Sequence, residues 1–149
     1  MKHLNLETHE FKAALLPEAE HYEHSAKDCA DCAAYARFLA IAYTASAPTF
    51  KGAGDAYKAA TQAVKIGCHT AAREIAAIAN AAYGAAVDLC TTATYYAGDV
   101  ATAVPPLELL HYTDGAFVAN KAALETIEKF KKSKKWERFR LPLNNLDQP

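Results

Sequence analysis

Apolar residues recur at helical spacing through the middle of this chain. Between Ala71 and Gly98 they follow one another in alternating steps of four and three, which is the spacing of one face of an α-helix. The positions predicted to be buried are Ala71, Ile75, Ile78, Ala82, Ala85, Leu89, Thr92 and Tyr96. Because alanine recurs among them, we expect a neighbouring helix to approach closely.

Prolines and glycines divide the rest of the chain into further predicted helices. A helical pattern runs over 18–47, and we expect Pro48 to stop it because proline lacks the N–H that an inner turn requires. Asp55 is a good N-cap residue, so a second helix is predicted over 55–66. Gly67 either ends this helix or lies within a longer one, and the sequence leaves both alternatives open.

The last third of the chain is predicted to hold one more long helix. A short helical turn over 107–111 follows two prolines and leads to the turn residues Thr113, Asp114 and Gly115. The long helix is predicted over 117–132, and its inward residues are Phe117, Leu124, Ile127 and Phe130. Residues 1–16 are expected to form an N-terminal segment and 141–149 an extended C-terminal tail.

Alanine, which supplies 34 of the 149 residues, decides the expected fold class. It has the best helix propensity, because it loses no side-chain entropy and hides no polar group. A chain of this length can bury a sufficient core without disulfides. We therefore predict an all-α single domain over 1–149, a bundle of four to five helices that is either irregular or up-and-down.

The formal net charge of −1 hides two blocks of opposite charge. Residues 7–31 hold seven acids against two lysines, and 129–140 hold seven basic residues against one glutamate. The two blocks either pair with each other or offer two surfaces to a partner. The candidate partner-binding residues are His21, His24, Asp28 and Asp31 in the acidic block and Lys131, Lys132, Lys134, Lys135, Trp136 and Arg138 in the basic block.

Four cysteines are the candidate metal ligands. Cys29 and Cys32 form a C-x-x-C pair, and residues three apart on a helix project to one side. Cys68 or Cys90 from a neighbouring helix would complete a tetrahedral set for zinc or another transition metal. The alternative is that the cysteines are reduced and pack as small apolar groups, since so few cysteines do not suit a secreted disulfide scaffold.

The sequence contains neither a glycine-rich phosphate loop nor an H-E-x-x-H zinc motif, and it nominates no catalytic residue. The first hypothesis is a soluble, cytoplasmic helical module of the inhibitor or immunity type, which binds another protein and performs no catalysis. One alternative is a metal-binding bundle built on the cysteines. Another is binding of RNA or an anionic surface by the basic C-terminal helix. We expect no membrane span, and small residues along the helices would permit a homo-oligomer.

Overall fold

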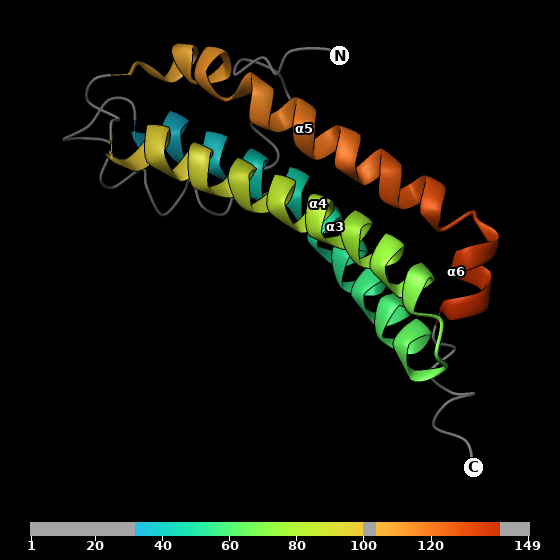
Figure 1. Cartoon of the computed structure of the whole chain (residues 1–149). Helices are drawn as coiled ribbons and strands as arrows, with labels where there is room; N and C mark the ends of the chain where they lie inside the picture. The colour runs from blue at the N-terminus through green and yellow to red at the C-terminus, as the bar shows by residue number, and fades with distance from the viewer. Residues whose placement is uncertain (1–31, 100–103, 141–149) are drawn as a thin grey trace. The chain divides into compact units, whose positions relative to one another are not determined.

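The computed structural model describes residues 32–99 and 104–140, and this part of the chain is helical without strands (Figure 1). Its elements are α3 (Cys32–Lys65), α4 (His69–Thr94), the π-helix η2 (Tyr95–Asp99), the 3₁₀ helix η3 (Pro106–Glu108), α5 (Leu109–Phe130) and α6 (Lys134–Phe139). Three of the α-helices are long and α6 is short. The prediction of an all-α fold is confirmed.

The described residues form two compact units. Unit 1 contains 32–47, 87–99 and 104–119, and unit 2 contains 48–86 and 120–140. Each unit takes one segment from each of the three long helices and has its own apolar cluster. The extent of a single domain over 1–149 stays a prediction.

The core of unit 2 is built mainly from alanine on α3 and α4. The two helices form a hairpin, and the second half of α5 adds Ile127 and Phe130. The fully or almost fully buried members are Ala53, Ala56, Ala59, Ala60, Ala63, Ala72, Ile75, Ala79, Ala82, Ile127, Phe130 and Phe139. Small side chains let the α3 and α4 backbones pack closely, and α5 and α6 add the larger residues Ile127, Phe130 and Phe139.

The buried face of α4 is turned by one residue from the predicted one. The buried residues of α4 and of η2, which continues it, are Ala72, Ile75, Ala79, Ala82, Ala86, Leu89, Ala93 and Ala97. Ile75, Ala82 and Leu89 are shared with the prediction, whereas Ala71, Ile78, Ala85, Thr92 and Tyr96 are only half-buried. In a helix this rich in alanine, hydrophobicity alone does not distinguish the central line of the face from its edge.

Pro48 does not stop the first long helix, and this prediction is wrong. α3 runs as one helix of 34 residues through Pro48, and Asp55 lies inside it rather than capping a new helix. An internal proline costs about 3 kcal/mol. Packing of α3 on both sides of Pro48 offsets that cost, since Ala42 in unit 1 and Ala53 in unit 2 are each completely buried in their own cluster.

Gly67 ends the second half of α3, which settles the alternative left open by the sequence. Its φ of 82° is in the left-handed region that favours glycine. The Gly67 N–H donates to the Val64 carbonyl at 3.0 Å, and the Cys68 N–H donates to the Ala63 carbonyl at 2.8 Å. This pair of hydrogen bonds is the Schellman motif, and it turns the chain tightly into α4.

The predicted turn at 113–115 is also wrong, because α5 begins at Leu109 and passes through it. Thr113 is completely buried, and its hydroxyl donates to the Leu109 carbonyl within the helix. That bond satisfies the hydroxyl without a turn. Further along α5, Phe117, Ile127 and Phe130 are buried as predicted, and Leu124 is half-buried.

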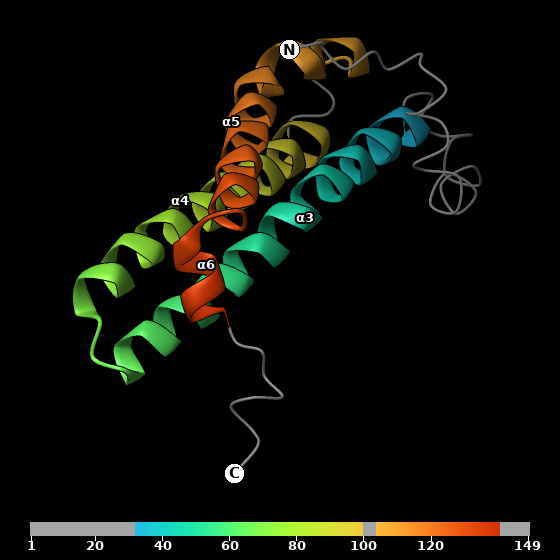
Figure 2. The same ribbon diagram turned by 90° about the vertical axis from the view of Figure 1, so that its right-hand side faces the viewer.

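The basic C-terminal run folds back onto unit 2 as α6. The Ser133 hydroxyl caps the helix by accepting from the Trp136 N–H at 3.2 Å. Phe139 is buried in the core, and Trp136 packs edge-to-face on Phe130 at a centroid distance of 5.7 Å. In Figure 2, α6 lies beside the end of the α3–α4 hairpin.

Asp55 connects α3 with this C-terminal run. Its Oδ2 atom accepts from Lys131 Nζ at 2.7 Å and from Lys51 Nζ at 3.2 Å. Partial burial raises the pKa of Asp55, but the two lysines outweigh burial by hydrogen bonding and charge, and the net pKa lies below the usual 3.8. Because the pKa of Asp55 is lower in the folded state than in the unfolded state, its ionised form stabilises the fold at any pH above the unfolded-state pKa. This stabilisation is lost as the pH falls through the folded-state pKa.

We therefore expect Asp55→Asn to destabilise the protein at neutral pH by about 1 kcal/mol and to have little effect once Asp55 is protonated in both states. Urea unfolding at pH 7 and at a series of values below 4 would measure the difference from the wild type. Glu128→Gln, at an exposed position on α5, is the matched control and should show no comparable loss. A destabilisation by Asp55→Asn that is unchanged at low pH would contradict the ion-pair account.

Candidate functional site

Four aromatic rings form a continuous cluster on unit 1. Tyr95 meets Tyr96 edge-to-face at 5.1 Å, Tyr96 stacks on Tyr112 at 5.0 Å with an interplanar angle of 26°, and His111 meets Tyr112 edge-to-face at 5.4 Å. Tyr95 is 49% exposed and Tyr112 is 46% exposed. We call these four residues the aromatic surface. Exposed rings that hold each other in place are unusual on a surface that only meets water.

Two local features of the chain position these rings. At its C-terminal end α4 continues as the π-helix η2, which begins with Tyr95 and Tyr96. The first turn of α5 carries His111 and Tyr112, and Tyr96 anchors the cluster because it packs against the core of unit 1. π-Helical turns are rare and often mark functional sites, because they re-aim side chains at the cost of regular helix geometry.

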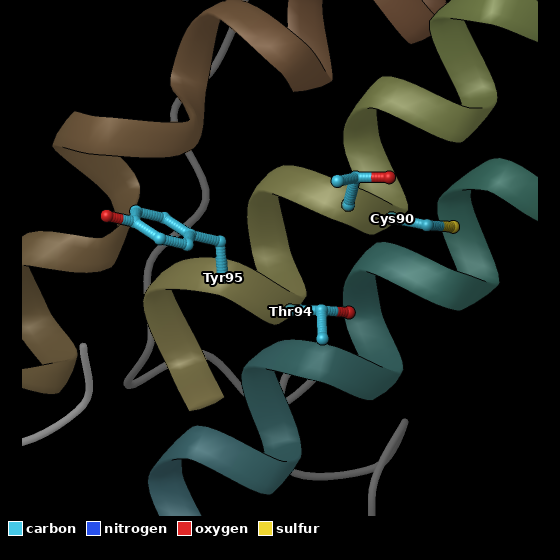
Figure 3. Close-up of a pocket in the computed structure, with 4 residues that line it drawn as sticks. Cys90, Thr94 and Tyr95 are labelled. Atoms are coloured by element: carbon cyan, nitrogen blue, oxygen red, sulfur yellow. The ribbon is translucent and has the colours of Figure 1, made fainter. Parts of the chain in front are cut away.

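A shallow depression of about 360 Å³ adjoins the aromatic surface and is lined by Cys90, Thr91, Thr94 and Tyr95. Figure 3 shows Cys90 and Thr94 directed towards α3 and Tyr95 directed away from them. The polar groups here bond to α3 within the unit: Ser46 Oγ lies 3.1 Å from Cys90 Sγ, and Tyr43 Oη lies 2.8 Å from Thr94 Oγ1. These contacts fix the wall of the depression on its α3 side, where Tyr43 is 45% exposed.

The two units carry opposite charge. The described residues of unit 1 include one Arg against four Asp and Glu, whereas those of unit 2 include twelve Lys and Arg against five Asp and Glu. In unit 1 the exposed acids are Asp88 on α4 and Glu108 on η3, close in sequence to the rings of the aromatic surface. The aromatic surface therefore belongs to an acidic unit, and the C-terminal run belongs to a basic one.

The predicted cysteine set is not brought together in the part of the chain that the structure describes. Cys32 is disulfide-bonded, so the expectation of reduced thiols is wrong there, while Cys68 and Cys90 are free. Cys90 contacts Ser46 in unit 1, and Cys68 accepts from Arg138 at 3.4 Å in unit 2. Cys29 lies outside the described residues. Over 32–99 and 104–140, no group of three His, Cys, Asp or Glu side chains is placed to hold a metal ion.

The predicted acidic surface, His21, His24, Asp28 and Asp31, also lies outside the described residues.

The predicted basic surface is partly neutralised within unit 2. Lys131 pairs with Asp55, and Lys135 pairs with Glu74. Lys131 also lies over the half-buried Trp136 ring, with Nζ 5.4 Å from the centroid. Lys132, Lys134 and Arg138 are exposed.

Sequence reasoning missed the aromatic surface, although Tyr95 and Tyr96 are adjacent in the chain. The useful indication was the pair of adjacent tyrosines near the end of an alanine-rich helix, two residues before Gly98. Their helical spacing suggested burial for Tyr96 alone, and the contact with Tyr112 joins residues that lie on different helices.

No protein-family model, curated protein or solved structure matches this chain.

Among the described residues, the helical stretch His69–Gly98 has the length and apolar composition of a membrane-crossing helix. Core helices of soluble proteins can have the same length and composition. The expectation that the chain has no membrane span stays a prediction.

Proposed function

We propose that this protein is a helical interaction module that binds a protein partner through the aromatic surface of unit 1 and performs no catalysis itself. The observation that supports the proposal is the contact of four rings in which Tyr95 and Tyr112 remain about half exposed. A cytoplasmic location, an inhibitor or immunity type of role and a bundle of four to five helices belong to the same proposal.

The physical argument rests on tyrosine at interfaces. Tyrosine supplies a large, rigid contact area with few rotatable bonds, and it is enriched among the residues that dominate binding energy. Ring contacts already immobilise Tyr95 and Tyr112, so less side-chain entropy is lost on binding. Exposed carboxylates on the same unit, Asp88 and Glu108, favour a partner whose contact surface is basic.

The experiment is site-specific photo-crosslinking in cells, with p-benzoylphenylalanine at Tyr112. Tyr83, which is 50% exposed and lies in unit 2, is the matched control position. We expect a discrete adduct at Tyr112 that is missing at Tyr83. With the crosslinked protein purified, Tyr112→Ala should weaken its binding at least tenfold, an effect typical of an interface hot spot, and Tyr83→Ala should not.

Three results would count against this proposal. They are the same adducts at both positions, a Tyr112 adduct that contains only a second copy of this chain, and an affinity for the isolated partner that Tyr112→Ala leaves unchanged. Circular dichroism of each variant would confirm that the helices are retained, so that a loss of binding reports the surface and not unfolding.

A further inference from the structure

The α3–α4 hairpin of unit 2 ends in two aliphatic side chains that point into solvent. Val64 is 51% exposed and Ile66 is 50% exposed, on either side of Lys65. The Schellman hydrogen bonds at Gly67 hold this turn in one conformation, so the exposure is a property of the fold. We call Val64, Lys65 and Ile66 the hairpin tip.

Basic groups surround the hairpin tip. Lys65, His69 and Arg73 are exposed on the hairpin itself. α6, which lies beside the α3–α4 hairpin in Figure 2, brings its own cations to the same end of unit 2. Lys135 pairs with Glu74, and Arg138 Nη2 lies 3.4 Å from Cys68 Sγ. The pairing with Lys135 neutralises Glu74, the carboxylate on the first turns of α4.

A groove beside the tip combines the two kinds of group. Its volume is about 380 Å³, and its lining includes Val64, Thr61, His69 and Arg73. An apolar side chain, an arginine, a histidine and a threonine hydroxyl thus lie along one depression. This combination suits a ligand that presents anionic and apolar chemistry within a few ångströms, as the headgroup region of a phospholipid bilayer does.

We propose that the hairpin tip is a docking site for the surface of an anionic phospholipid bilayer. Val64 and Ile66 enter the boundary between headgroups and acyl chains, while Lys65, Arg73 and Arg138 of α6 contact the negative headgroups. Each basic residue near such a surface strengthens binding roughly fivefold. Two aliphatic side chains add a modest apolar contribution, so the interaction is peripheral and reversible.

A nucleic acid fits the same cations less well. Its phosphate backbone offers nothing apolar to Val64 and Ile66, which would stay in contact with water or charge. Among the aromatic residues of 129–140, Phe130 and Phe139 are buried and Trp136 packs on Phe130, so none of them is free to stack on unpaired bases. The apolar tip is the feature that distinguishes a bilayer from a polyanion.

The test is flotation of the purified full-length protein with vesicles of phosphatidylcholine alone and of phosphatidylcholine with phosphatidylserine. We expect binding only to the vesicles that contain phosphatidylserine. Val64→Ser with Ile66→Ser should lower the partition coefficient at least tenfold, and Arg73→Gln should lower it roughly fivefold. Val118→Ser, at a position 42% exposed in unit 1, is the matched control and should bind as the wild type does.

Four outcomes would overturn the proposal: no binding to either vesicle, unchanged binding of the double serine variant, binding to duplex RNA that exceeds binding to the anionic vesicles, and retention after alkaline extraction, which indicates a spanning helix. All substituted positions are solvent-exposed, and a thermal melt of each variant checks that the fold is retained. This docking site is in unit 2 and does not depend on the aromatic surface of unit 1, so either proposal can fail alone.

Discussion

Replacement of Ala82 by glutamate is expected to unfold unit 2. Ala82 is 1% exposed and belongs to the buried cluster that α3, α4 and α5 form in that unit. The cluster consists of alanine with a few larger apolar residues, so a carboxylate there would have neither space nor a hydrogen-bonding partner. Burial of an unpaired polar or charged group costs several kcal/mol, a large part of the total stability of a small protein.

The neighbouring positions make this experiment specific to the helix face. Ala81 is exposed, and Ala81→Glu should melt within a few degrees of the wild type. Ala85 is half-buried, so Ala85→Glu should fall between the two. Thermal unfolding followed by far-ultraviolet circular dichroism orders the three variants. A wild-type melting transition for Ala82→Glu, or a greater loss for Ala81→Glu, would show that the buried face of α4 is assigned incorrectly.

Replacement of Gly52 by alanine is expected to destabilise the protein by about 1–2 kcal/mol, although alanine favours helix. A Cβ atom at Gly52 would lie 2.5 Å from Ile127 Cγ2 and 3.4 Å from Ile127 Cβ. Ile127 is 1% exposed, and its β-branched side chain has one preferred rotamer in a helix. The contact therefore forces α3 and α5 apart within unit 2 or moves the isoleucine off its rotamer.

Gly54 provides the control for this variant. A Cβ atom there meets nothing within 4 Å, so Gly54→Ala should stabilise the protein by roughly 0.5–1 kcal/mol through helix propensity. Both substitutions change the unfolded chain in the same way, and their difference in urea denaturation thus isolates the folded-state contact. Equal stabilisation by the two alanines would mean that α5 does not pack on Gly52.

The sequence predicted the helical class because alanine dominates it. On α5 it predicted Phe117, Ile127 and Phe130 correctly, whereas it missed the buried Leu109. The buried face of α4 was predicted one residue away from its true position where two adjacent residues are both alanine, as at Ala71 and Ala72. The prediction that the first helix ends at Pro48 was wrong. The local cost of the proline, a few kcal/mol, can be read from the sequence, but the burial of Ala42 and Ala53 that offsets this cost cannot.

The candidate sites were harder to predict than the helices. The aromatic surface needs Tyr96 and Tyr112 to meet across two helices, and no local pattern encodes that contact. The hairpin tip depends on whether Gly67 ends α3, which the sequence left open. In the basic run, Lys131 and Lys135 pair with carboxylates on α3 and α4, and no local pattern in the chain indicates these long-range pairs.

The two units differ in the sign of their charge, so each proposed surface favours a different kind of partner. The acidic unit 1 carries exposed tyrosines, which suits a basic protein surface, and the basic unit 2 carries an exposed aliphatic tip, which suits an anionic bilayer. Both interactions should weaken as ionic strength rises, because each includes exposed charges that salt screens.

Photo-crosslinking from Tyr112, with Tyr83 as the control position, decides whether the aromatic surface binds a protein partner. We expect one discrete partner adduct from Tyr112, none from Tyr83, and at least tenfold weaker binding of the purified partner to Tyr112→Ala. Identical adducts from both positions, or an affinity that Tyr112→Ala does not change, would contradict the assignment of the aromatic surface as the binding site.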